Sequence, residues 1–551
     1  MMTVVAALSV ACSSGPEFAF SPGAGSTPVA SPEPANTILP PETAARYGGV
    51  LRIAQAADPA SCDLHSSRAL SYQAVHPCNP MLSQLVRASA LDHAVIEPDL
   101  AVDWRVDPDG KTWRLKLREG VSWHDGSPFT ADDVLFSLHR IIEPPQGVAI
   151  GRADAFARYV SSREQVRMEG EELVIETDFP AASFLPNLAS VYVSIYPRAA
   201  TEALDPPSMT SFNSVVGTGP FKAGAEVRGS RYELEANDDY YISSLPYLDG
   251  VEFHVMPEPA VRMAALRNHD IDTIAVITEQ EALGLEQDFA GRITVHKTPS
   301  AGGNTVQMNM LRAPFDDERV RLAVNLAISR SDAELALGTG FVGAVLPPGG
   351  PFAMPPEQVQ KLPGFGDKET ERAQARRLLA DAGFPQGFET TVHTRANPFF
   401  QTLSEFVAGQ LETIGIRATV VPVEAVAYQE MIMGGDFAMI GHSHSFALDD
   451  PDSVLPAHYS CGAAENFPGL CDPALDSLIE QQSRELNAGR RRELLDQIER
   501  LIWEKDAKVW FQWSSRRTPV WNTVAGLEPG GPSLYQGRRL DQVYLTGGSG
   551  Q

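Results

Sequence analysis

The segment 388–443 alternates strand and helix patterns, and this order restricts the possible folds more than any other feature of the sequence. Three short apolar runs have the composition of buried strands and are separated by two stretches with helical periodicity. In chain order, these five segments are 388–394, 399–414, 416–423, 425–434 and 436–443. A β-α-β-α-β order predicts a parallel sheet with right-handed crossovers. In such sheets, ligands bind beyond the carboxyl ends of the strands.

The whole chain is too long for one hydrophobic core. With 551 residues it is expected to fold into two or three lobes. Apolar residues make up 43% and charged residues 21% of the chain, which is typical of a packed protein and excludes a disordered or multi-span membrane chain. The formal net charge of -26 repels phosphate backbones, so we expect no nucleic-acid partner. We interpret the acidic excess as solvated surface, and a preference for cationic or zwitterionic ligands is the alternative.

The N-terminus resembles a bacterial lipoprotein signal. Residues 1–12 form a short apolar run that ends in Ala11-Cys12, and in such signals the cysteine is lipidated and becomes the mature N-terminus. Residues 13–45 contain seven prolines and many small residues, which predicts a disordered tether. No other segment has the roughly 20 apolar residues that span a bilayer. We therefore expect an extracytoplasmic protein, in the periplasm or on the outer face of the cytoplasmic membrane, that is attached only through lipid on Cys12.

The other four cysteines form two local pairs, Cys62 with Cys78 and Cys461 with Cys471. Neither spacing is that of a zinc site, and no histidine is suitably placed beside either pair. In an oxidising compartment we expect two disulfides, each closing a short loop and adding ~2–3 kcal/mol of stability. Buried free thiols are the alternative.

Several motifs along the chain carry a family resemblance. The loop Trp123-His124-Asp125-Gly126 precedes a capped helix that begins at Thr130-Ala131-Asp132-Asp133. The turn Val216-Gly217-Thr218-Gly219-Pro220-Phe221 and the segment Asn237-Asp238-Asp239-Tyr240-Tyr241 follow later in the chain. Together these motifs closely resemble those of the extracytoplasmic solute-binding proteins of the peptide and nickel ABC importers, bacterial solute-binding family 5.

The resemblance implies a two-lobed, periplasmic-binding-protein-like α/β fold of type II, cluster C, with an additional α+β domain. In this division, 1–12 is the signal and 13–45 the tether. Lobe I combines 46–80, 213–305 and 511–551, the extra domain is 81–212, and lobe II is 306–510. A hinge motion would close the lobes around the ligand.

The resemblance also implies a function. The chain would be the substrate-binding lipoprotein of an ABC importer, a monomer that captures a peptide or peptide-like solute in the cleft and delivers it to the permease subunits. No enzymatic activity, cofactor or metal is implied. A non-peptide ligand, such as an opine, a sugar or a metal chelate, is the alternative within the family. A hydrolase or a chaperone or adhesin is the alternative from a different class, although no nucleophile elbow, P-loop or HExxH motif supports an enzyme.

Two segments follow strands of the predicted sheet, 395–398 and 445–452. In dipeptide- and oligopeptide-binding members of the family, an arginine in the first pairs with the peptide carboxylate and an aspartate in the second pairs with the amino group. Arg395 fits the first role, because a guanidinium holds a carboxylate with two parallel bonds; an ordinary surface arginine is the alternative. The position of the family aspartate is Ala447 here, so Asp449 or Asp450 would have to replace it, unless both serve turn and cap chemistry. The predicted ligand contacts are Arg395, Asn397, Ser445, Phe446, Ala447, Asp449, Asp450 and Trp513.

Two further features have alternative interpretations. His442 and His444 would share one strand face and could bind a metal, but no third ligand has recognisable spacing. Trp513 belongs to a C-terminal aromatic cluster with Trp510, Phe511 and Trp521. Core packing explains most of this cluster, and one or two of its members could form a ligand wall.

Overall fold

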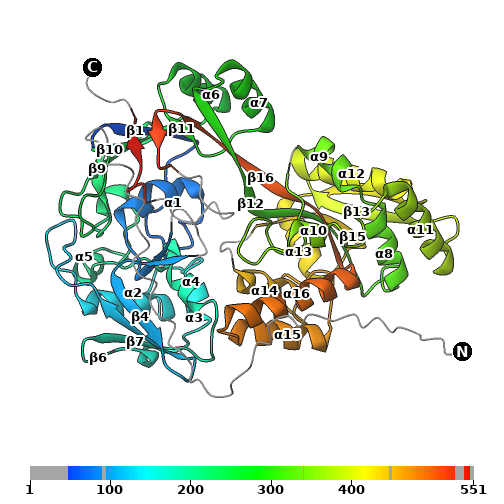
Figure 1. The fold of residues 1–551 in the computed structure, drawn as a ribbon, viewed down its shortest axis with the longest axis horizontal. Coiled ribbons are helices and arrows are strands. Elements are labelled where there is room, and N and C mark those ends of the chain that lie inside the picture. Colours follow the sequence, from blue (N-terminus) through cyan, green and yellow to red (C-terminus); the bar gives the residue numbers. More distant parts are fainter. Residues whose placement is uncertain (1–46, 90–94, 339, 446–449, 528–538, 547–551) are drawn as a thin grey trace, which may run out of the picture.

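The structure is a computed structural model that describes residues 47–89, 95–338, 340–445, 450–527 and 539–546. Figure 1 shows two bodies connected by two long strands, β12 (Ile293–Met308) and β16 (Lys508–Trp521). These strands pair antiparallel with each other and belong to one ten-stranded sheet, in the order β14-β13-β15-β12-β16-β11-β1-β10-β9-β8. The other strands of this sheet are β1 (Val50–Gln55), β8 (Phe221–Val227), β9 (Arg231–Ala236), β10 (Gly250–Val255), β11 (Thr273–Ile274), β13 (Glu389–Arg395), β14 (Arg417–Val423) and β15 (Met439–Ser445).

The first body holds most of the N-terminal half of the chain. It contains an antiparallel four-stranded sheet in the order β4-β5-β7-β6, within the residues assigned to the extra domain. Its strands are β4 (Ala101–Val106), β5 (Thr112–Leu117), β6 (Val166–Glu169) and β7 (Glu172–Glu176). Two small sheets pair β2 (Val86–Ala88) with β3 (Ile96–Pro98) and β17 (Val524–Ala525) with β18 (Tyr544–Leu545). The α-helices of this body are α1 (Tyr72–Cys78), α2 (Ala131–Ile142), α3 (Asp154–Ala157), α4 (Phe184–Leu188), α5 (Arg198–Glu202), α6 (Pro259–Asn268) and α7 (Glu279–Asp288).

The second body confirms the predicted β-α-β-α-β unit. β13 pairs in parallel with both β14 and β15, and the connections contain α12 (Pro398–Glu412) and α13 (Ala425–Met433). Gly415 has φ +92°, a left-handed conformation that favours glycine after a helix. The remaining α-helices of this body are α8 (Glu318–Ala327), α9 (Arg330–Leu337), α10 (Pro356–Val359), α11 (Lys368–Asp381), α14 (Leu455–Tyr459), α15 (Pro473–Arg484) and α16 (Ala488–Lys505).

The buried apolar residues are grouped by body. One continuous core joins residues assigned to lobe I with residues assigned to the extra domain, and separate clusters lie in the second body. The predicted lobe boundaries at 305/306 and 510/511 fall inside β12 and β16, which continue from one body into the other. The division into three parts stays a prediction, but the shared core shows that residues assigned to lobe I pack against residues assigned to the extra domain.

Two of the sequence motifs meet in space. The N–H of Gly217 donates to Nδ1 of His124 (3.2 Å), and Nε2 of His124 donates to the carbonyl of Gly219 (3.0 Å). A Cβ atom on Gly217 would lie 1.8 Å from the carbonyl oxygen of Met81, so no larger residue fits at this position. Burial lowers the pKa of His124 to about 4, which keeps the imidazole neutral and able to accept at Nδ1.

Both predicted cysteine pairs are brought together. The structure joins Cys62 to Cys78 and Cys461 to Cys471, with Cα–Cα distances of 5.3 and 4.5 Å. These distances are in the range of protein disulfides. The two predicted pairings are thus confirmed. None of the helices within the described ranges has both the length and the apolar composition that crossing a bilayer requires.

A buried histidine beside the first disulfide predicts that acid destabilises the first body. His65 is fully buried; its Nε2 donates to the carbonyl of Ser194 (2.8 Å), and Nδ1 accepts from Arg140 (3.0 Å). Burial is the largest cause that lowers the pKa of His65 to about 3, and the charge of Arg140 is the second largest. Between pH 6.5 and about 3, the unfolded chain therefore binds more protons than the folded protein. The free energy of unfolding thus decreases by ~1.4 kcal/mol for each unit by which the pH is lowered in this window.

The measurement compares the parent with His65→Gln by urea unfolding. The glutamine amide keeps one donor and one acceptor but does not titrate. Between pH 6.5 and 5 the parent should lose about 2 kcal/mol more stability than the variant. Equal losses in the two proteins would contradict the neutral, buried state of His65.

Candidate functional site

Arg395 lies at the carboxyl edge of the sheet in the second body. It is the last residue of β13, and β15, the parallel neighbour of β13, ends at the same edge with Ser445. The half-buried guanidinium carbon of Arg395 lies 5.2 Å from the ring centroid of Phe400 and 5.4 Å from that of Tyr428. Among the described residues, no hydrogen bond or ion pair engages this guanidinium. Its donors are therefore available for an anionic ligand.

Neutral side chains lie beneath this arginine. The hydroxyl of Tyr428 lies 3.2 Å from Nδ1 of His442, and their rings are stacked. Burial is the largest cause that lowers the pKa of His442 to about 3, and the charge of Arg395 is the second largest. His442 is therefore neutral near pH 7, so Arg395 supplies the positive charge of this corner.

The histidines of β15 belong to a buried ring cluster. The rings of His442 and His444 have centroids 4.8 Å apart, and His444 is also 4.8 Å from His458. All three are less than a tenth exposed, and burial lowers the pKa of each. Within the described part of the chain, no group of three or more His, Cys, Asp or Glu side chains has an arrangement that could hold a metal ion.

Two predicted ligand contacts have structural roles. The Oδ1 atom of Asn397 accepts a hydrogen bond from the N–H of Phe399 (3.0 Å) and caps α12. Trp513 is fully buried, donates from Nε1 to the carbonyl of Ala344 (3.1 Å) and stacks on Trp510 with centroids 4.8 Å apart. Capping and core packing account for these two side chains, and their contact with a ligand stays a prediction.

The segment after β15 is described only in part. Phe446, Ala447 and Asp449 lie outside the described residues. Asp450 is buried and forms a bidentate ion pair with Arg491 of α16, with Nη2–Oδ1 and Nη1–Oδ2 distances of 2.9 and 3.2 Å. Its carboxylate also accepts from the N–H of Asp452 at the start of a 3-10 turn, Pro451–Ser453. Asp450 thus already has a cationic partner within the protein, and its predicted role as ligand for an amine stays a prediction.

A buried polar contact joins the extra domain to lobe II at this ion pair. Ser183, which precedes α4, has its Oγ 2.5 Å from Oδ1 of Asp450 and 2.7 Å from Oδ2 of Asp452, and it accepts from Nη2 of Arg491 (2.8 Å). The four side chains are each less than a tenth exposed. Nothing in the sequence pattern indicates this contact, since Ser183 and Asp450 are 267 residues apart.

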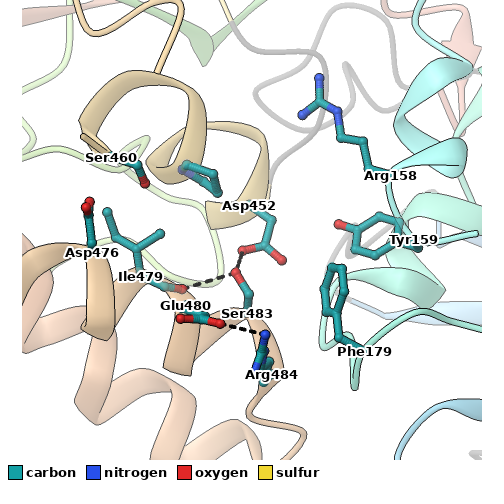
Figure 2. Close-up of a pocket in the computed structure, with 11 residues that line it drawn as sticks. Arg158, Tyr159, Phe179, Asp452, Ser460, Asp476, Ile479, Glu480, Ser483 and Arg484 are labelled. Atoms are coloured by element: carbon teal, nitrogen blue, oxygen red, sulfur yellow. Dashed lines mark hydrogen bonds and ion pairs between the residues drawn. The ribbon is translucent and has the colours of Figure 1, made fainter. Parts of the chain in front are cut away.

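A cavity of about 420 Å³ lies next to this contact (Figure 2). Its volume is in the range of small-molecule sites. One wall comes from the extra domain and the other from the 3-10 turn and helices α14 and α15. The lining residues are Arg158, Tyr159, Phe179, Asp452, Pro456, Ser460, Asp476, Ile479, Glu480, Ser483 and Arg484. Because the two walls belong to different bodies, a hinge motion would open or close this cavity.

The comparisons with known proteins agree with the fold. Residues 95–466, more than half of the chain, match the family model described as "Bacterial extracellular solute-binding proteins, family 5 Middle". The chain is 26% identical over 474 residues to the dipeptide-binding protein of Escherichia coli (strain K12), covering 81% of this chain and 86% of that protein.

Two solved structures are similar over nearly the whole chain. One is the ABC transporter-associated periplasmic binding protein DppA from Helicobacter pylori in complex with the peptide STSA, with 25% identity, a TM-score of 0.70, and coverage of 91% of this chain and 98% of that one. The other is AgaA from A. tumefaciens R10 in complex with agropinic acid, with 22% identity, a TM-score of 0.69, and coverage of 91% and 98%. The predicted two-lobed α/β fold is confirmed by these similarities.

Proposed function

The chain belongs to family 5 of the bacterial extracellular solute-binding proteins, and from this premise we propose that it captures a peptide or peptide-like solute between its two bodies. It then delivers the solute to the permease subunits of an ABC importer. The observation that carries the proposal is Arg395, a half-buried guanidinium at the carboxyl edge of a parallel sheet with no partner among the described residues. The names of the dipeptide-binding protein and of the DppA complex support a peptide as ligand.

The chemistry of this corner suits a terminal carboxylate. A guanidinium offers two parallel N–H donors, and the rings of Phe400 and Tyr428, 5.2 and 5.4 Å from the guanidinium carbon, add apolar surface next to it. The planar peptide unit next to the carboxylate can lie against these rings. In this proposal, Arg395 fixes the orientation of the ligand and the hinge closes over it.

A carboxylate ligand without a free amine is the second candidate. Ala447 occupies the position of the family aspartate, and Asp450 is already paired with Arg491. The predicted amine site in 445–450 therefore has no vacant acid among its described residues. The agropinic acid complex of AgaA is an example of a non-peptide ligand on this fold.

The proposal includes a location and a mode of attachment. We propose that lipid on Cys12 anchors a monomer to the membrane and that residues 13–45 let it reach the permease. In this role the chain catalyses no reaction and releases its ligand intact. Detergent partitioning of the full-length protein and of Cys12→Ala tests the anchor, since only the parent should enter the detergent phase.

Isothermal titration with a peptide panel tests the function. The panel contains di-, tri- and tetrapeptides, each with a free and an amidated C-terminus, together with agropinic acid. At least one free-acid peptide should bind, and its amidated form should bind at least ~10-fold more weakly because it lacks the charge that Arg395 recognises. Binding of agropinic acid alone would favour the second candidate. Equal binding of acid and amide forms would contradict the role of Arg395.

A further inference from the structure

One serine side chain of the extra domain forms its hydrogen bonds with the other body. Ser183 lies just before α4, and its Oγ does not cap the helix that it precedes. Within the described residues, the three partners of this oxygen are Asp450, Asp452 and Arg491 of lobe II. Ser183 is 3% exposed, so little of it is open to water. The hydroxyl therefore serves the contact between the bodies rather than the fold of its own body.

The partners in lobe II are held in place without the serine. Asp450 forms its ion pair with Arg491, and Oδ1 of Asp452 accepts hydrogen bonds from Gln482 (2.5 Å) and Ser483 (2.6 Å). The serine hydroxyl has one proton, so it donates to one carboxyl group at a time. Burial is the largest cause that raises the pKa of Asp452, and the charge of Asp450 is the second largest. A proton kept on Asp452 can then make the other contact as a donor to the serine oxygen.

A backbone hydrogen bond lies beside the serine. The N–H of Ala182 donates to the carbonyl of Ser483 (2.8 Å). Ser483 is in the last turn of α15, where carbonyl groups have no partner within the helix, so this N–H satisfies one of them. Across the same interface, the guanidinium carbon of Arg484 lies 5.9 Å from the ring centroid of Phe179. We call this set of contacts the latch; its residues are Phe179, Ala182 and Ser183 in the extra domain and Asp450, Asp452, Ser483, Arg484 and Arg491 in lobe II.

The latch lies away from the strands that connect the bodies. Figure 1 shows β12 and β16 joining the bodies on one side, and α4 facing α14 and α15 on another. Each half of the latch is attached to a core of its own body, through Phe184 of α4 and Leu495 of α16. A rotation about the connecting strands would separate the two halves, whereas the hydrogen bonds within each half would stay. The latch therefore forms in one arrangement of the bodies and not in another.

We propose that the latch is a conformational device that holds the two bodies closed through contacts of the protein itself and thereby slows the release of a captured solute. The hydroxyl of Ser183 enters a preformed polar socket in lobe II and leaves it when the bodies separate. Opening exchanges hydrogen bonds within the protein for hydrogen bonds to water, so its net cost is modest and the movement is reversible. The effect on release rests on the proposed function, whereas the effect on the arrangement of the bodies does not.

Small-angle X-ray scattering of the protein without added solute tests the closure. Ser183→Asp places a third carboxylate against Asp450 and Asp452, and the repulsion between like charges should drive the halves of the latch apart. The variant should fold, because the new carboxylate faces water once the bodies separate. Its radius of gyration should be larger than that of the parent. Adding Asp452→Asn should return the radius toward the parent value, because only two carboxylates then remain.

A second serine of the first body provides the matched control. Ser230 is exposed in the turn between β8 and β9, so Ser230→Asp adds the same charge without contact to lobe II. Its radius of gyration should equal that of the parent. Equal radii for Ser183→Asp and Ser230→Asp would overturn the proposal.

Stopped-flow kinetics test the effect on release. Ser183→Ala removes the hydroxyl without adding a charge. The tightest-binding free-acid peptide of the panel should leave this variant ~10-fold faster than the parent, since hydrogen bonds to charged groups are lost from the closed form. Association should stay within ~2-fold of the parent, because the peptide enters before the latch forms. Ser230→Ala should release the peptide like the parent, and equal release from Ser183→Ala and Ser230→Ala would overturn the proposal.

The two measurements separate this proposal from the proposed function. If no peptide of the panel binds, the proposed function fails, and the scattering measurement alone decides about the latch. If peptides bind but Ser183→Asp has the same radius of gyration as Ser230→Asp, the latch is overturned and the proposed function stands.

Discussion

Arg491→Met is expected to lower the free energy of unfolding by about 3–5 kcal/mol, the usual cost of removing one partner from a buried ion pair. Arg491 and Asp450 are 5% and 3% exposed, and their bidentate contact is the only ion pair that the described residues give to either side chain. Without the arginine, Asp450 and Asp452 would be buried side by side with no compensating cation. Urea unfolding followed by tryptophan fluorescence measures the loss.

Two further proteins show whether the loss comes from the uncompensated carboxylate. Arg490→Met changes the adjacent, exposed arginine and should cost less than ~1 kcal/mol. The double variant Arg491→Met with Asp450→Asn should recover a large part of the loss, because it removes the charge that Arg491 compensated. If Arg491→Met is no less stable than Arg490→Met, the buried contact between lobe II and Ser183 of the extra domain does not exist in solution.

Arg395→Ala is expected to weaken binding of the best free-acid peptide by roughly 2–5 kcal/mol, the usual loss when one partner of a buried charge pair is removed. Stability should change little, because the guanidinium forms no hydrogen bond or ion pair with the described residues. Isothermal titration gives the change in affinity, and urea unfolding checks the fold.

A matched control uses another arginine of the same sheet. Arg417 begins the neighbouring strand β14, is 61% exposed, and forms an exposed ion pair with Glu389 (3.4 Å). Arg417→Ala should bind the peptide like the parent. Should Arg395→Ala bind as tightly as Arg417→Ala, the carboxylate site lies elsewhere in the protein, although the fold and the family would be unaffected.

The sequence predicted the parts of the fold that depend on local patterns. The β-α-β-α-β unit follows from apolar periodicity, and the strand β13 is shifted by only one residue from the predicted 388–394. The two disulfides close short loops, so each cysteine had one obvious partner. Arg395 could be placed because the carboxyl end of a parallel strand is defined by the topology.

Contacts between distant segments could not be predicted in this way. Ser183, Asp450 and Arg491 meet although the serine and the arginine are 308 residues apart. Tyr159, which lines the cavity, lies just after the four-residue helix α3, and no periodicity in the sequence marks this position. Asn397 illustrates the opposite problem, since its place before Pro398 is also the pattern of a helix cap, and the structure shows this role.

Mass spectrometry of the ligand tests the central claim most directly. The protein is purified without denaturant from cells that express it, and the small molecules released by subsequent denaturation are identified. The account predicts intact peptides or peptide-like solutes with a free carboxylate, bound to the parent and to Arg417→Ala and depleted in Arg395→Ala. Released solutes that lack a carboxylate, or an equal yield from the parent and Arg395→Ala, would contradict it.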